Sequence, residues 1–114
     1  MGKFLQIRVS AWTYREEDVA DNWPNLCALA WPAPPRPGEK RGVLELAETL
    51  HTGILYAGWN SNLKKLLAQG IDEVENIRNQ LENALANWEP RAANKLSERL
   101  EEILTDLEDI VPRQ

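Results

Sequence analysis

The chain contains a single cysteine and a single histidine, and nucleophilic or metal chemistry would have to be built around them. Cys27 and His51 have the residue types of a nucleophile and its base. Cys27, however, lies between Leu26 and Ala28 in an apolar run, where a thiol packs as a small hydrophobic group. A zinc site built from several Cys and His ligands of one chain is excluded by this count. We therefore predict structural roles for both side chains, with His51 half-buried beside an apolar helical stripe.

Two short motifs match known sites only in part. Glu48 and His51 have the Glu-x-x-His spacing of a di-metal carboxylate bundle, but this spacing occurs once, so a symmetric dimer would have to supply the second copy. Gly53 and Gly58 have the spacing that opens a phosphate-binding Walker A loop, yet Trp59 and the residue after it stand where Lys and Ser or Thr are required. The many acidic pairs are expected on solvated helix faces. We predict no catalytic residue, no metal site and no cofactor, and we favour a protein that is not an enzyme.

The five tryptophans are the feature of the composition that most needs a physical explanation. One interpretation is that they fill the core and cover the joint between the two halves of the chain, with each indole N–H bonded. The other is that some of them line a pocket or a protein-binding surface, where tryptophan is a favoured residue. We favour the core. Under the second interpretation the candidate binding surface comprises Trp12, Trp23, Trp31, His51, Tyr56 and Trp59.

The chain has the length and composition of one globular domain. Its 114 residues are 43% hydrophobic and 27% charged, which is enough apolar material to form a core without disulfides. The net charge of −5 opposes binding to a phosphate backbone, so a nucleic-acid partner is not expected. The sequence has no run of about 18 apolar residues and does not open like a signal peptide. We predict a cytoplasmic protein with no membrane association.

Local patterns predict the elements of the amino-terminal part. Residues 3–12 are predicted as a strand, because Leu5, Ile7, Val9 and Ala11 fall on one face of it. A lone strand leaves its backbone donors and acceptors unpaired, so it needs a partner in this chain or in a second copy. Residues 22–31 are predicted as a short buried helix, and residues 32–41 as a proline-rich surface connection that also has the spacing of a PxxP ligand.

The remaining residues are predicted to be helical and to belong to the same single domain, 1–114. Residues 43–69 form a central helical region, in which Gly53 to Ala57 fits either helix or a short strand, and we favour helix. Gly70 is expected to end this region. Residues 71–111 carry two apolar seams with heptad-like spacing on either side of Pro90, which predicts an antiparallel helical hairpin. The predicted fold class is therefore mainly α, a small helical domain with a short amino-terminal β-strand.

Function is predicted only by class. The first hypothesis is a non-catalytic protein–protein interaction or regulatory subunit, which presents its helical hairpin and tryptophan-bearing surface to a homodimer partner or to another protein. The alternative is a small-molecule-binding domain or minor enzyme with a tryptophan-lined pocket, to which His51 and Tyr56 contribute polar contacts. An acidic mimic of nucleic acid is a third hypothesis, which the modest net charge does not favour.

Overall fold

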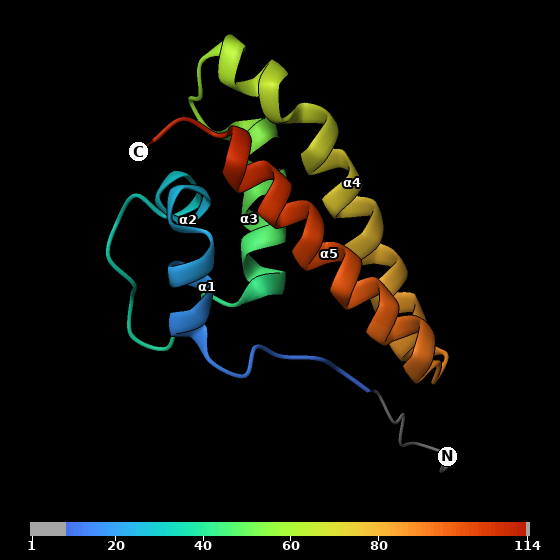
Figure 1. Ribbon diagram of the computed structural model, residues 1–114. Coiled ribbons are helices and arrows are strands. Elements are labelled where there is room, and N and C mark those ends of the chain that lie inside the picture. The colour runs from blue at the N-terminus through green and yellow to red at the C-terminus, as the bar shows by residue number, and fades with distance from the viewer. Residues whose placement is uncertain (1–8, 114) are drawn as a thin grey trace.

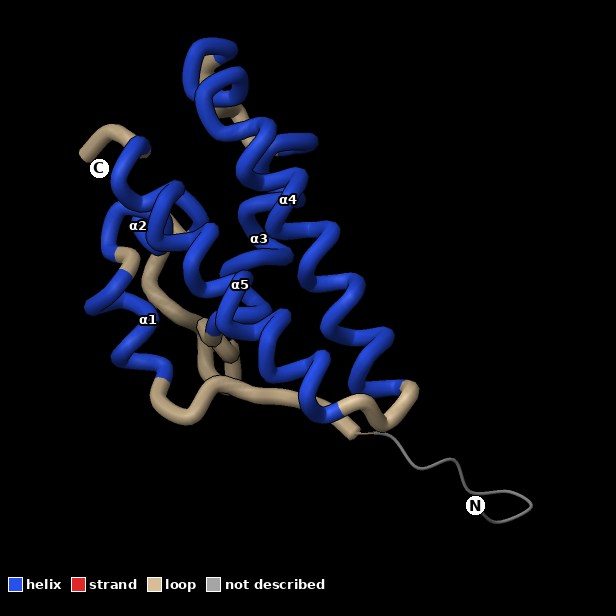
Figure 2. Tube along the Cα trace, turned by 45° about the vertical axis from the view of Figure 1, so that its right-hand side comes forward, coloured by secondary structure: helices blue, strands red, loops and turns tan. Residues whose placement is uncertain are grey.

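The computed structural model describes residues 9–113, and these form a mainly helical domain (Figure 1). Its helices are α1 (Glu16–Asn22), α2 (Pro24–Ala30), α3 (Val43–Tyr56), α4 (Ser61–Ala86) and α5 (Pro90–Ile110). The two long helices, α4 and α5, lie side by side, with α3 packed against α4 and α2 packed against α5 (Figures 1 and 2). The predicted mainly helical fold class is confirmed.

The predicted amino-terminal strand is not found in the described part of the chain. Residues 3–8 of that prediction lie outside the described residues, and Val9 to Trp12 are neither strand nor helix. Between residues 9 and 113 no strand exists that could supply a hydrogen-bonded ladder. Residues 9–15 instead form an irregular segment that runs from α1 toward the turn between α4 and α5 (Figures 1 and 2). We call residues 9–14 the amino-terminal segment.

The antiparallel pair of α4 and α5 contains most of the core. Apolar residues three or four positions apart line the contact, so each helix turns one stripe toward the other. The buried residues are Leu67, Ile71, Val74, Leu81 and Ala84 on α4, and Ala93, Leu100, Ile103, Leu104 and Leu107 on α5. Each fully buried leucine contributes about 1.5–3 kcal/mol relative to exposure. None of the helices in residues 9–113 combines the length and apolar character needed to cross a lipid bilayer.

Gly70 does not end a helix, as the sequence had predicted, but lies inside α4. A Cβ atom at this position would overlap the side chain of Leu107 on α5. The glycine therefore lets the two long helices approach closely, which offsets its low helix propensity. As a result α4 begins at Ser61 and runs without a break through both the end of the predicted central region and the first half of the predicted hairpin.

The central region consists of α3 and the start of α4, separated by a short turn. Residues 53–56 are helical, which confirms the favoured interpretation over a short strand. Gly53 is buried because the indole ring of Trp59 packs directly on its backbone, where a Cβ would overlap the ring. Asn60 then caps α4, since its side-chain oxygen accepts a hydrogen bond from the N–H of Leu63 at 2.8 Å.

Hydrogen bonds from α5 hold the short helices in place. The carboxylate of Glu108 accepts the backbone N–H groups of Asn25 at 3.2 Å and Leu26 at 2.9 Å, and the Asn25 side-chain amide at 2.7 Å. These are donors of the first turn of α2, which a helix leaves without partners of its own. The indole Nε1 of Trp23 donates to Thr105 Oγ1 at 3.1 Å. The connection between α1 and α2 is thereby fixed on α5.

We predict that Glu108→Ala destabilises the fold by about 1–3 kcal/mol, because it leaves the first-turn N–H groups of α2 without their acceptor. The neighbouring Asp109→Ala is the matched control, since Asp109 is an exposed carboxylate on the same turn of α5. Urea denaturation of both variants measures the difference. Equal stabilities of the two variants would show that water replaces the Glu108 carboxylate without loss.

Candidate functional site

The structure distributes the six sequence-predicted site residues over several places instead of one surface. Trp12 and Trp23 line one cleft, Tyr56 and Trp59 line a second hollow, and Trp31 lines a third. Trp12 and Tyr56 are exposed, at 80% and 82%, whereas only 5% of Trp23 is exposed. Trp23 is thus a core residue that also lines the cleft.

The remaining predicted residues have local partners. The guanidinium of Arg41 stacks on the ring of Trp31, 5.2 Å from its centroid, which is a cation–π contact. His51 Nδ1 lies 3.8 Å from the carboxylate of Glu75. That carboxylate also pairs with Arg78 at 2.7 Å, and the Arg78 hydrogen bond is the main cause of the lowered pKa of Glu75. His51, Glu75 and Arg78 form a polar contact between α3 and α4.

The surroundings of Cys27 and His51 do not support the nucleophilic or metal-binding roles that the sequence left open for them. Within residues 9–113 no three Cys, His, Asp or Glu side chains gather closely enough to hold a metal ion. Cys27 Sγ donates to the carbonyl oxygen of Val19 at 3.7 Å, whereas His51 faces Glu75. Burial raises the pKa of the Cys27 thiol to about 11, with the nearby Glu108 carboxylate acting in the same direction and Arg41 opposing. A thiol in this state is a poor nucleophile.

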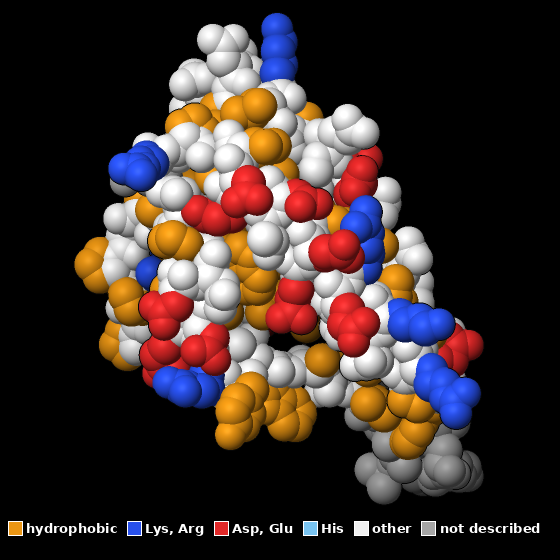
Figure 3. Space-filling model, viewed as in Figure 1, with side chains coloured by type: hydrophobic (Ala, Val, Ile, Leu, Met, Phe, Trp, Pro, Cys, Tyr) orange, Lys and Arg blue, Asp and Glu red, His pale blue; other side chains and the backbone are white. Residues whose placement is uncertain are grey.

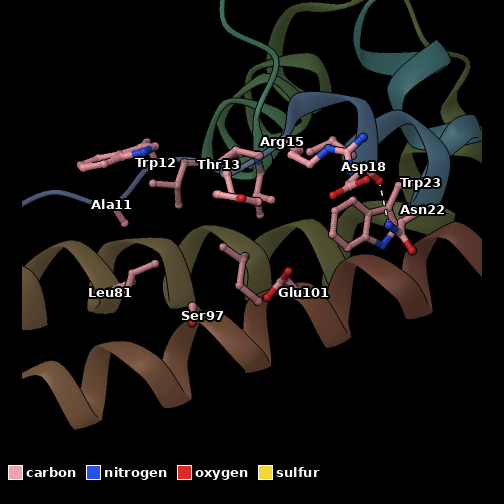
Figure 4. A pocket seen from close by; sticks show the side chains of 15 residues that line it. Ala11, Trp12, Thr13, Arg15, Asp18, Asn22, Trp23, Leu81, Ser97 and Glu101 are labelled. Carbon is pink, nitrogen blue, oxygen red and sulfur yellow. Dashed lines mark hydrogen bonds between the residues drawn. The ribbon is translucent and has the colours of Figure 1, made fainter.

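A cleft of about 260 Å³ lies between the amino-terminal segment and the helices beneath it (Figure 4). Trp23 and Leu100 are among the apolar residues of its lining, and Leu81 comes from α4. Asp18 reaches the cleft from α1 and Glu101 from α5, on the opposite side of the cavity (Figure 4). The space-filling view shows an opening between the segment and the helices next to it (Figure 3). The segment therefore crosses a hollow instead of packing onto the helices.

The side chain of Thr13 joins the amino-terminal segment to α3. Thr13 Oγ1 accepts the backbone N–H of Val43 at 2.8 Å, so it caps α3 from outside. Gly42 permits this contact, because a Cβ there would overlap Thr13. A fourth hollow, of about 280 Å³, lies along the segment next to Lys40 and Glu45. In the described part of the chain, the backbone groups of residues 9–14 make no hydrogen bond.

The amino-terminal segment and the tip of the hairpin present exposed apolar side chains along one end of the molecule. Trp12 is 80% exposed, and Tyr14, two residues further along the segment, is 93% exposed. Val9 belongs to the same segment, and Trp88, 61% exposed, lies in the turn between α4 and α5. Figure 3 shows hydrophobic side chains along this lower edge. We call these four residues the aromatic edge.

Three of the four residues of the aromatic edge are not among the six sequence-predicted site residues. Val9 was assigned to the strand, Tyr14 was not singled out, and Trp88 was assigned to an apolar seam. Tyr14 has no signal of spacing in the sequence, because the chain bends at this residue and does not form a strand. For Trp88 the short connection before Pro90 was the signal, because a residue in a tight turn between helices is exposed.

The backbone of Trp88 adopts the left-handed conformation, with φ at 59°. Its N–H bonds to the Leu85 carbonyl at 3.2 Å, and the N–H of Glu89 bonds to the Ala84 carbonyl at 2.8 Å. This is the Schellman arrangement that ends many helices, and its left-handed position usually holds glycine. A tryptophan there costs about 1–2 kcal/mol in backbone strain.

We predict that Trp88→Gly stabilises the fold by about 0.5–1 kcal/mol, because glycine adopts a positive φ without strain. The control is Asn87→Gly at the adjacent position, where φ is −93°, so the substitution adds only flexibility and lowers stability. Thermal or urea unfolding compares the two. A loss of stability in Trp88→Gly would show that the indole contributes packing that outweighs the strain.

We predict that alkylation of Cys27 by iodoacetamide at pH 8–9 is roughly 50- to 100-fold slower in the folded chain than in the urea-unfolded chain. The reason is that the thiolate is scarce below a pKa of about 11, compared with the ordinary value of 9.0. By the same linkage the folded state loses stability as the pH rises from 9 toward 11, because the unfolded thiol releases its proton first. Equal alkylation rates would contradict the buried, protonated thiol.

Comparison of this chain with protein-family models, with curated proteins and with solved structures finds no match. The residues that bear on function are therefore chosen by their geometry and chemistry in this chain. The candidates are the aromatic edge and the adjoining cleft.

Proposed function

We propose that this chain is a non-catalytic interaction protein that binds another protein chain through its aromatic edge, and that it acts in the cytoplasm. The observation that carries the proposal is the exposure of Trp12 and Tyr14 on a segment whose backbone is unpaired within residues 9–113. Tryptophan and tyrosine dominate the binding energy of many interfaces, because their large rings lose few rotamers on burial.

The placement of these rings supports an intermolecular role over a structural one. Trp23 contributes to the core through burial and through its hydrogen bond to Thr105. Trp12 and Tyr14 leave most of their surface in water, and their removal should cost the monomer little. Trp88 is held in a strained turn at the neighbouring hairpin tip. A partner that covers these rings would gain the burial that the monomer lacks.

The cleft under the segment supports a second candidate function, the binding of a small molecule. Its volume of about 260 Å³ is slightly below the range of about 300–1,000 Å³ that is typical of ligand pockets. Apolar residues and two indole rings border it, and its charged residues are Asp18, Glu101 and Arg15, so acidic groups outnumber basic ones. A ligand suited to this lining is a small organic amine with an apolar body.

We predict that the double variant Trp12→Ala with Tyr14→Ala captures at least about tenfold less partner protein than the unmodified chain, because two hot-spot rings are removed. The control is Leu55→Ala with Tyr56→Ala, which removes exposed apolar surface near the end of α3. The tagged full-length chain is immobilised, and captured protein is quantified by mass spectrometry for each variant.

The outcomes separate the two candidate functions. Both double variants should unfold within about 0.5 kcal/mol of the unmodified chain, so a difference in capture reports binding. Equal capture by both variants, together with a thermal shift and indole quenching by an organic amine, would replace the interaction function by ligand binding in the cleft. Loss in the Leu55 and Tyr56 variant alone would place the interface elsewhere.

A further inference from the structure

We propose that the proline-rich connection between α2 and α3 is a ligand for a proline-binding domain of another protein, whose groove is lined with aromatic rings and has an acidic side chain at its rim. This inference goes beyond the proposed function, because it concerns a second surface and a second partner. The docking residues are 34–37, with the sequence Pro-Pro-Arg-Pro, and we call them the proline segment.

The proline segment is exposed along its whole length. Four of the seven prolines of the chain lie in residues 32–37, and every residue of this range is exposed. Figure 1 shows the connection as an arc that passes outside α1 and α2 before it enters α3. Within residues 9–113 the carbonyl groups of Pro34 and Pro35 accept no hydrogen bond. Packing within the domain therefore does not explain why this connection is rich in proline.

Proline restricts the shape of this segment. A proline ring holds its own φ at about −65°, and a residue that precedes proline is confined to extended conformations. Pro34, Pro35 and Pro37 are of the first kind, and Arg36 is of the second. The chain bends at Ala33, just before the segment, but the segment has no helix, strand or bend before its final turn. Such a run favours polyproline II, in which residues three apart share a face.

Both ends of the proline segment are held by hydrogen bonds. Before it, Arg41 Nη2 donates to the Ala33 carbonyl at 2.8 Å. After it, the N–H of Glu39 bonds to the Arg36 carbonyl at 3.0 Å, and Gly38 has a φ of 79°. A proline followed by a residue with positive φ, closed by this bond, forms a type II turn. A ligand that is held in this way loses little conformational entropy on binding, which favours affinity.

Arg36 gives the proline segment a charge that can select its partner. Its guanidinium makes no hydrogen bond or ion pair within the described residues, and the carboxylate of Glu39 pairs with Arg41 instead, at 3.0 Å. Residues 32–41 contain three basic residues and one acidic residue, although the whole chain has a net charge of −5. A locally basic loop of this kind is complementary to a groove with an acidic rim.

The segment offers the contacts that an aromatic groove requires. Pro34 and Pro37 have the PxxP spacing that such grooves bind, and in polyproline II they share a face. Pro35 lines the third hollow together with Trp31, so it borders the domain and leaves the other two prolines to the partner. Tryptophan and tyrosine side chains of the groove can pack on these prolines and donate hydrogen bonds to the unpaired carbonyl groups.

A panel of purified SH3 and WW domains, which have grooves of this kind, tests the inference. Each domain is immobilised, and binding of the full-length chain is measured by surface plasmon resonance. At least one domain should bind the unmodified chain, and the double variant Pro34→Ala with Arg36→Ala should bind it at least about tenfold more weakly. Pro37 stays unchanged, because it belongs to the turn that holds the segment.

The matched control is Pro112→Ala with Arg113→Ala, which removes the same two residue types from another exposed part of the chain. It should bind within about twofold of the unmodified chain. All four positions lie outside the helices, so circular dichroism should show unchanged helical content in both double variants. The inference is overturned if no domain of the panel binds, or if the two double variants bind equally.

Charge reversal tests the acidic rim. Arg36→Glu keeps every proline and should weaken binding, with a larger effect at low ionic strength, where charges are screened less. Binding as tight as that of the unmodified chain would overturn the acidic rim. Trp12→Ala with Tyr14→Ala should not change binding to the panel, so this inference and the proposed function succeed or fail separately. Loss of binding in that variant would move the contact to the aromatic edge and overturn the proline segment as the ligand.

Discussion

The close contact of α4 with α5 is the interaction on which the rest of the structure depends. At Gly70 the two helices approach so closely that Leu107 occupies the space of a side chain. Helices of seven residues, such as α1 and α2, are too short to be stable alone and need a surface on which to pack. The α4–α5 pair supplies that surface, and Glu108 and Thr105 supply the polar groups that orient the short helices on it.

The amino-terminal segment owes its position to this arrangement and adds little to it. Once α2 is fixed on α5, α3 lies against α4 and its first turn points toward the chain that precedes α1. Thr13 completes that turn, and beyond it the segment passes over a cavity. Few buried apolar contacts and unpaired backbone groups are features of regions with low local stability. Such a segment can exchange water for a partner without disturbing the core.

The helical seams could be predicted from sequence, because Leu100, Ile103 and Leu107 repeat with a helical period that only burial on one side explains. The role of Gly70 could not be predicted from sequence. Glycine both ends helices and permits close contacts between helices, and only the position of Leu107 distinguishes these two roles. The candidate site was predicted only in part. Trp12 and Trp23 are the same residue type, so the sequence does not separate them. Trp23 is buried and hydrogen-bonded to Thr105, whereas Trp12 is exposed.

The stability of the monomer does not account for the residues of the aromatic edge. Glycine would suit the turn at position 88 better than tryptophan, and the rings of Trp12 and Tyr14 gain almost no burial where they stand. Exposed rings alone would bind partners with little directional preference, because the hydrophobic effect is non-directional. The backbone beside them, which has no hydrogen bond within residues 9–113, is directional, since hydrogen bonds that it formed with a partner would fix both register and orientation. In the proposed interaction, the apolar rings would supply affinity and the backbone would select an extended partner.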